Sequence, residues 1–155
     1  IASGGTDNLL TIFDIKDAKG WDIVEPTKEL SGHEGYVSCA RFLDNNQVLT
    51  SSGDKTCRLW DLEKSVQLSK YEGHTGDVEC LALNPALKTM FVSGSVDAVC
   101  KVWDTRAHQI IVNFKQHKEG TDINAVTFFP EGKAFISGGD DKTVRLFDMS
   151  SYRQL

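Results

Sequence analysis

The sequence predicts an all-β protein, an arc of a β-propeller with about three and a half four-stranded blades. A unit of 43–47 residues repeats along the 155-residue chain, and each unit contains short strand-like segments separated by turn residues. A repeat of this period is typical of propellers and related architectures. The segments are apolar on both faces, which predicts sheets packed between neighbouring sheets. No segment shows sustained helical periodicity.

The repeat is defined by an aromatic residue followed by Asp. These pairs are Phe13-Asp14, Trp60-Asp61, Trp103-Asp104 and Phe147-Asp148. Counting back six residues from each aromatic always gives Asp, and counting back ten always gives Ser or Thr. A His follows Gly or Gln near the start of each of the last three units, at His33, His74 and His117. Agreement at so many positions indicates that the four units are equivalent.

Within each unit, apolar and β-branched runs end at Gly and Asp, which favour turns. The expected inner strands are residues 37–42, 78–83 and 123–129. The expected hairpins join 48–52 to 56–60, 91–93 to 99–103, and 134–137 to 143–147, and a more polar strand follows each aromatic–Asp pair, as at 66–71. The predicted units are a partial blade with a connection (1–31), two blades (32–72 and 73–115), and a blade truncated in its outer strand (116–155).

Composition places the chain among globular proteins, with 40% hydrophobic and 25% charged residues. A net charge of −5 disfavours nucleic-acid binding by bulk electrostatics. The longest apolar run is Cys80–Leu83, too short for a transmembrane helix. The chain starts at Ile1 without Met or a leader-like segment, so we expect an excerpt or a processed chain.

The four cysteines occupy two repeated positions within predicted strands. Cys39 and Cys80 each follow a repeat histidine by six residues, and Cys57 and Cys100 each precede a tryptophan by three. This pattern predicts buried free thiols rather than disulfides or metal ligands. Because there is no Cys-x-x-Cys pair and no histidine cluster, no zinc site is expected. Free thiols favour a reducing, intracellular environment.

The Gly-His…Trp-Asp period resembles WD40 repeats over the whole chain. Longer strings resemble the middle blades of the beta subunit of heterotrimeric G proteins, at residues 44–57, 73–78, 122–130 and 140–148. The last string includes Phe147, where most repeats have Trp. The resemblance implies a ring of seven blades, of which this chain forms part. It also implies that the N-terminal helix that pairs with a gamma subunit is absent from these residues.

The recurring His, Ser/Thr and Asp are the residue types of a hydrolase triad. A triad occurs once per active site, however, whereas this trio occurs in three units, and the chain has no Gly-x-Ser-x-Gly motif. The resemblance implies structural networks instead, in which the indole N–H, the hydroxyl, the imidazole and the carboxylate are hydrogen-bonded in series. The sets are Trp60, Thr50, His33 and Asp54; Trp103, Ser93, His74 and Asp97; and Ser137, His117 and Asp141, where Phe147 offers no N–H.

Binding residues usually lie on loops held by a rigid scaffold. The end of the propeller that carries the loops opening each blade is acidic, and we expect Tyr36 and Asp122 to be exposed there. The resemblance implies that eight residues at this end contact the switch region of the alpha subunit: Thr6, Asn8, Tyr36, Asp77, Glu79, Asp122, Asn124 and Asp140. The family usually has leucine at the position of Thr6 and methionine at that of Glu79, so affinity or specificity is expected to differ.

The resemblance therefore implies a non-enzymatic signalling scaffold that needs no cofactor or metal. It would bind a GDP-loaded alpha subunit and, when released with a gamma subunit, effector proteins. The expected location is cytoplasmic, at the inner face of the plasma membrane through lipidated partners, and no nucleic-acid partner is expected. The alternative is another WD40 adaptor, such as a ubiquitin-ligase substrate receptor, which the long matching strings disfavour.

Three expectations concern less regular features. His108 matches no repeat position and is predicted to lie in a surface turn. Trp21 lies in a longer connection and either anchors a partner or packs the loop; the sequence leaves both open. Because the end sheets would show apolar faces, residues 1–155 on their own are expected to associate.

Overall fold

The computed structural model describes residues 1–20 and 23–155, so Trp21 lies outside the described residues. The described residues form β-strands, turns and loops, and none of them forms a helix that could cross a membrane. The strands are β1 (Ala2–Gly4), β2 (Leu10–Ile12), β3 (Lys28–Leu30), β4 (Val37–Phe42), β5 (Gln47–Ser52), β6 (Cys57–Asp61), β7 (Val66–Tyr71), β8 (Val78–Leu83), β9 (Met90–Ser95), β10 (Cys100–Asp104), β11 (Gln109–Phe114), β12 (Ile123–Phe128), β13 (Ala134–Gly139), β14 (Val144–Asp148) and β15 (Arg153–Gln154).

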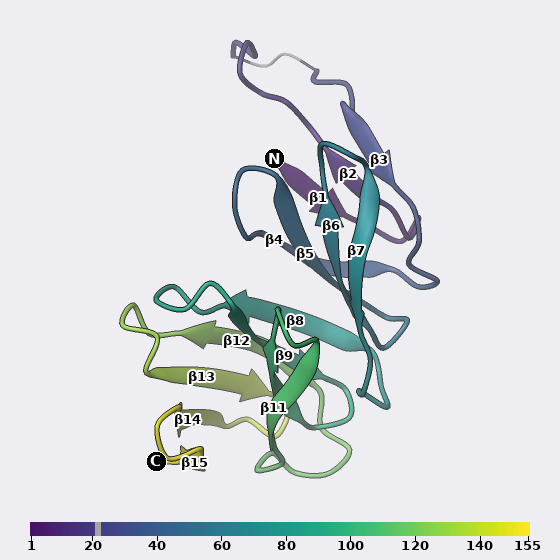
Figure 1. Cartoon of the computed structure of the whole chain (residues 1–155). Helices are drawn as coiled ribbons and strands as arrows, with labels where there is room; N and C mark the ends of the chain where they lie inside the picture. Colours follow the sequence, from purple (N-terminus) through teal and green to yellow (C-terminus); the bar gives the residue numbers. More distant parts are fainter. Residues whose placement is uncertain (21–22) are drawn as a thin grey trace.

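The strands form four antiparallel sheets that follow one another along the chain (Figure 1). The first contains β1–β3, and the others contain β4–β7, β8–β11 and β12–β15. Within each sheet, every strand pairs with the next in sequence. Short turns with Gly or Asp join the second and third strands of each four-stranded sheet, whereas residues 13–27 connect β2 to β3. This arrangement confirms the predicted all-β propeller arc.

Neighbouring sheets pack face to face, and we call each such contact a seam. One buried apolar cluster fills each of the three seams. In the middle seam, Leu49 and Tyr71 of one sheet pack with Leu81, Phe91 and Trp103 of the next. The central strands are therefore buried on both sides, which explains why they lack polar alternation.

The four cysteines are free thiols that lie in the seams. Cys39 Sγ donates to the carbonyl of Leu81 at 3.8 Å, and Cys80 Sγ donates to the carbonyl of Ile123 at 3.5 Å. Both bonds reach the following sheet. Burial raises the pKa of the Cys100 thiol to about 12, which keeps it protonated and unreactive.

Two turn positions adopt a left-handed backbone in several units. The turns from β1 to β2, from β5 to β6, from β9 to β10 and from β13 to β14 place Asn8, Lys55, Ala98 and Lys142 at φ values of 65°, 71°, 63° and 62°. The turns between the third and fourth strands place Ser65, His108 and Tyr152 at 55°, 53° and 53°.

The prediction that His108 matches no repeat position is therefore wrong. Like Ser65 and Tyr152, it lies five residues after the unit's aromatic residue. This position repeats as a backbone conformation and not as a residue type, so a comparison of residue types misses it. The side chain is exposed, and its ring centroid lies 5.8 Å from that of Tyr71.

Candidate protein-binding surface

Each of the three four-stranded sheets contains a buried hydrogen-bond network. In the first, Trp60 Nε1 donates to Thr50 Oγ1 at 2.9 Å, and Thr50 Oγ1 lies 2.7 Å from His33 Nε2. His33 Nδ1 lies 2.7 Å from Asp54 Oδ2. Because the carboxylate accepts the Nδ1–H, Nε2 of a neutral imidazole is left to accept from the hydroxyl.

The next two units repeat this arrangement. Trp103 Nε1 donates to Ser93 at 2.8 Å, Ser93 lies 2.8 Å from His74 Nε2, and His74 Nδ1 lies 2.8 Å from Asp97. In the last unit, His117 lies 2.6 Å from Ser137 and 2.9 Å from Asp141. Phe147 occupies the tryptophan position without an N–H, so this network is one bond shorter.

Burial and hydrogen bonding shift the protonation equilibria of these networks. Burial lowers the pKa of His33 and His74, although the carboxylate beside each opposes this change. Burial alone would raise the pKa of Asp97, but the hydrogen bond from His74 and two main-chain N–H groups lower it to about 2. The pair is therefore a neutral imidazole beside an ionised carboxylate.

Two of the networks each include an arginine that the sequence did not predict there. Arg58 Nη2 lies 3.2 Å from Asp54, and Arg145 Nη2 lies 3.4 Å from Asp141. Lys101 holds the same place in the middle unit and donates instead to Asn113 at 2.7 Å. All three lie two residues before the unit's aromatic residue, so the same backward count finds them. Charged side chains are usually solvated, which hides this pattern in the sequence.

The hydroxyl groups of these networks are inaccessible to a substrate. Thr50 and Ser93 have no exposed surface, and Ser137 is 1% exposed. Each hydroxyl is held between the imidazole and, in two units, an indole. The arrangement suits a structural role, because unpaired buried polar groups are costly, and it does not suit nucleophilic attack.

The candidate binding surface is the edge of the sheets that carries the loops before β4, β8 and β12. We call this edge the rim. It contains the eight predicted contact residues Thr6, Asn8, Tyr36, Asp77, Glu79, Asp122, Asn124 and Asp140. Tyr36, Asp77 and Asp122 are equivalent, since the main-chain oxygen of each accepts an N–H from the adjacent hairpin turn at 2.9–3.0 Å. The turn with Thr6 and Asn8 joins this edge through the bond from Val37 N to Gly5 O, at 3.0 Å.

β-Bulges determine the direction in which some of the rim side chains point. The pairing of β8 with β9 shifts between Val78 and Cys80, which leaves Glu79 as the extra residue. The same register shift makes Ser38 the extra residue in β4 and Asn124 the extra residue in β12. A bulge redirects a side chain from the sheet face, and here it turns Glu79 and Asn124 towards the rim.

The structure brings six of the eight residues together in two groups. Tyr36 donates its hydroxyl to Asp77 at 3.2 Å and to Glu79. In the other group, the main-chain N–H of Asp140 donates to the carbonyl of Asp122 at 3.0 Å, and the Asn124 amide donates to the Asp140 carboxylate at 2.5 Å.

The expectation that Tyr36 and Asp122 lie in exposed loops is wrong, since both are half-buried. Their seam and turn hydrogen bonds account for the burial.

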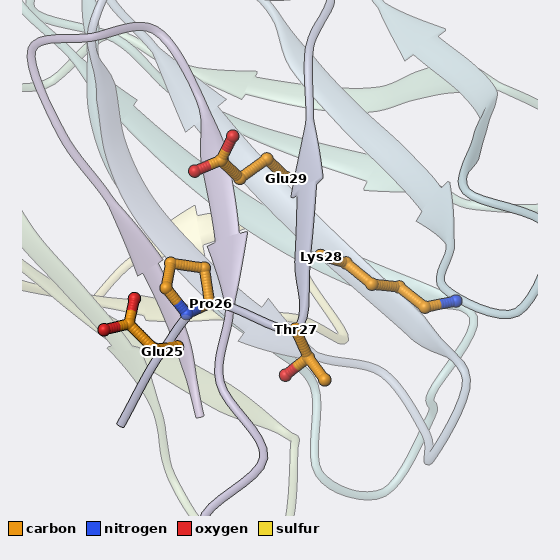
Figure 2. A pocket seen from close by; sticks show the side chains of 5 residues that line it. All are labelled: Glu25, Pro26, Thr27, Lys28 and Glu29. Atoms are coloured by element: carbon orange, nitrogen blue, oxygen red, sulfur yellow. The ribbon is translucent and has the colours of Figure 1, made fainter. Parts of the chain in front are cut away.

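A hollow of another kind lies along the segment that leads into β3 (Figure 2). It has a volume of about 480 Å³ and is lined by five consecutive residues, 25–29. Lys28 extends away from the two glutamates and donates to the carbonyl of Glu63 at 3.2 Å. A shallow hollow along one chain segment does not suit a small-molecule site. Nor do His, Cys, Asp or Glu side chains of the described residues cluster in a way that could hold a metal ion.

The fold agrees with that of a known protein family. Residues 1–155 match the family described as G protein beta WD-40 repeat protein. The chain belongs to this family. Proteins of the G protein beta WD-40 family are non-enzymatic scaffolds, consistent with the buried network hydroxyls.

Curated members of the G protein beta family are similar over the entire chain. The chain is 40% identical to the guanine nucleotide-binding protein subunit beta of Oryza sativa subsp. indica, 39% to that of Arabidopsis thaliana and 38% to that of Zea mays. Each alignment covers 100% of this chain and 43% of the relative. The chain thus spans less than half the length of these G protein beta subunits.

Proposed function

We propose that the chain is part of a G-protein beta subunit that binds a GDP-loaded alpha subunit through the rim. The observation that carries the proposal is the convergence of Tyr36, Asp77 and Glu79 at one seam, beside Asp122, Asn124 and Asp140 at the next. These groups come from loops and bulges on rigid sheets, the usual setting of binding residues. Similarity to proteins named as G-protein beta subunits supports the assignment of partner.

The rim suits a protein partner better than a small molecule. Tyr36 offers an aromatic ring with a polar end, a frequent anchor of interfaces. The carboxylates around it would favour a partner surface with basic residues and would speed association. Thr6 and Asn8 extend the same surface towards the first sheet.

We further propose that the complete protein binds a gamma subunit and, once free of the alpha subunit, presents the rim to effector proteins. It would act in the cytoplasm, at the inner face of the plasma membrane, held there by lipids on its partners. The proposed units of the chain are residues 1–31, 32–72, 73–115 and 116–155. No cofactor or nucleic acid is part of this proposal.

Titration calorimetry with the full-length chain, its gamma subunit and a GDP-loaded alpha subunit tests the proposal. The double variant Asp122→Ala, Asp140→Ala should lose about 30-fold in affinity, which corresponds to roughly 2 kcal/mol. Glu131→Ala, an exposed change in the turn at the opposite end of the fourth sheet, is the control and should bind as the unmodified protein does. Equal affinity of both variants, with thermal unfolding unchanged, would exclude the rim as the alpha-subunit surface.

A further inference from the structure

The Tyr36 side chain is held from two sides. On its own blade, the ring lies against the turn after β5, where a Cβ atom on Gly53 would overlap the ring. The main-chain oxygen of Tyr36 also accepts the Gly53 N–H at 2.9 Å. Glycine at position 53 therefore leaves the space that the ring occupies.

The hydroxyl of Tyr36 crosses the seam to the next blade. It donates to Glu79, and Asp77 Oδ2 lies 3.2 Å away. A phenol has one proton to donate, so the two carboxylates share it. Burial, together with the nearby Glu79 and Asp77 carboxylates, raises the pKa of Tyr36, so the phenol stays protonated and keeps this donor role.

The contact depends on the bulge at Glu79. Because Glu79 is the extra residue in β8, its backbone is not paired in the β8–β9 ladder. Its side chain reaches Tyr36 of the previous blade. Asn124 is the extra residue at the same place in the following blade, but its amide bonds to Asp140 of its own blade. The chain thus offers an internal comparison between a bulge residue that crosses a seam and one that does not.

We propose that Glu79 is a positioning residue, which holds Tyr36 across the seam in the orientation that meets a partner protein. The partner half of this inference rests on the proposed function. A hydrogen bond to an ionised acceptor is stronger than one between neutral groups. Fixing an aromatic side chain before binding removes an ordering cost that would otherwise lower affinity. Glu79 therefore contributes to binding through Tyr36.

A double-mutant cycle in the full-length protein with its gamma subunit tests this inference, with affinity for a GDP-loaded alpha subunit as the readout. Glu79→Leu and Tyr36→Phe should each weaken binding by about three- to tenfold. The double variant should bind no more weakly than either one. Glu79→Gln keeps an acceptor oxygen and should restore affinity to within about twofold of the unmodified protein. Losses that multiply in the double variant, or no recovery with Gln, would overturn the positioning role.

A measurement without partner separates this inference from the proposed function. With tyrosine labelled with ¹³C at Cζ, Glu79→Leu should shift the Tyr36 resonance, whereas Asn124→Leu should leave it in place. An unchanged Tyr36 resonance in Glu79→Leu would overturn the inference even if an alpha subunit binds. If no alpha subunit binds the unmodified protein, the proposed function and the partner half of the inference both fail, and the resonance shift alone decides whether Glu79 holds Tyr36.

Discussion

The indole N–H of Trp103 donates to the hydroxyl of Ser93 at 2.8 Å, and both residues are fully enclosed between two sheets. The bond joins the third strand of the blade to the second, ten residues earlier in the sequence. In the last unit, Phe147 takes the place of this tryptophan and stacks on Phe135, with ring centroids 4.8 Å apart. Trp103 stacks on Phe91 in the same way, with ring centroids 5.9 Å apart. The two neighbouring blades thus share the aromatic packing and differ in the hydrogen bond.

Exchanging these aromatic residues should destabilise both blades. Trp103→Phe removes a donor from a buried hydroxyl and leaves a small cavity, so the free energy of unfolding should fall by about 2–3 kcal/mol. Phe147→Trp should also cost about 1–3 kcal/mol, because the larger ring must fit against Phe114 and Phe135. Urea unfolding of the full-length protein measures both. A stabilising Phe147→Trp would show that the last network has room for the indole.

The repeat histidines should matter for stability far more than the histidine of the surface turn. His74→Ala leaves Ser93 and Asp97 short of a partner in a buried site, so we expect a loss of about 1–3 kcal/mol. His108→Asn introduces a residue that tolerates the left-handed backbone at φ 53°. It should change the free energy of unfolding by less than about 0.5 kcal/mol. Similar shifts of the urea midpoint for the two variants would contradict the assignment.

Stability should fall in two steps as the pH is lowered. Burial lowers the pKa of His74 below its ordinary value of 6.5, so below that value the unfolded chain binds a proton that the folded chain refuses. This contribution is therefore present above pH 6.5 and is lost as pH falls towards the folded pKa. Asp97, with its pKa lowered to about 2 from 3.8, contributes stability above pH 3.8 that is lost between these two values.

Urea unfolding at pH 8, 6, 5 and 3 checks this dependence. The free energy of unfolding should drop between pH 8 and 5, and the drop should be smaller in His74→Gln, which cannot take up the proton. His33 shifts in the same direction and should keep part of the first step in that variant. A free energy that is constant from pH 8 to 5 would contradict neutral, buried imidazoles in the folded state.

The strands could be predicted from the sequence because their residue types recur, and the networks because the repeated residues resemble those of WD40 repeats. Each aromatic–Asp pair marks the third strand, and counting back from it finds the partner carboxylate at six residues and Thr50 or Ser93 at ten. The left-handed turns could not be predicted in this way, because Lys55 and Ala98 share a backbone conformation but have chemically different side chains. The backward count also reaches Arg58, but a charged residue type does not by itself predict a buried network partner.

The contact from Tyr36 to Glu79 could not be predicted from the repeat. It joins non-equivalent positions of two different units, and it depends on a bulge that takes Glu79 out of the ladder. Periodicity identifies equivalent residues and says nothing about which side chain reaches across a seam. The degree of burial of Tyr36 depends on this contact, and for that reason the expectation of an exposed loop was wrong.

Relieving the strained backbone of the turn after β5 should stabilise the protein. Lys55 is exposed and has a φ of 71°, a conformation that side chains other than Asn, Asp and Gly adopt at a cost. Lys55→Asn should therefore raise the free energy of unfolding by about 0.5–1 kcal/mol, and Lys142→Asn, at φ 62°, should act in the same direction.

Lys88→Asn is the matched control, since Lys88 is also exposed and is absent from the left-handed positions of the described residues. It should change stability by less than about 0.5 kcal/mol. Equal effects at Lys55 and Lys88 in urea unfolding would show that the gain comes from the loss of a positive charge and not from the backbone.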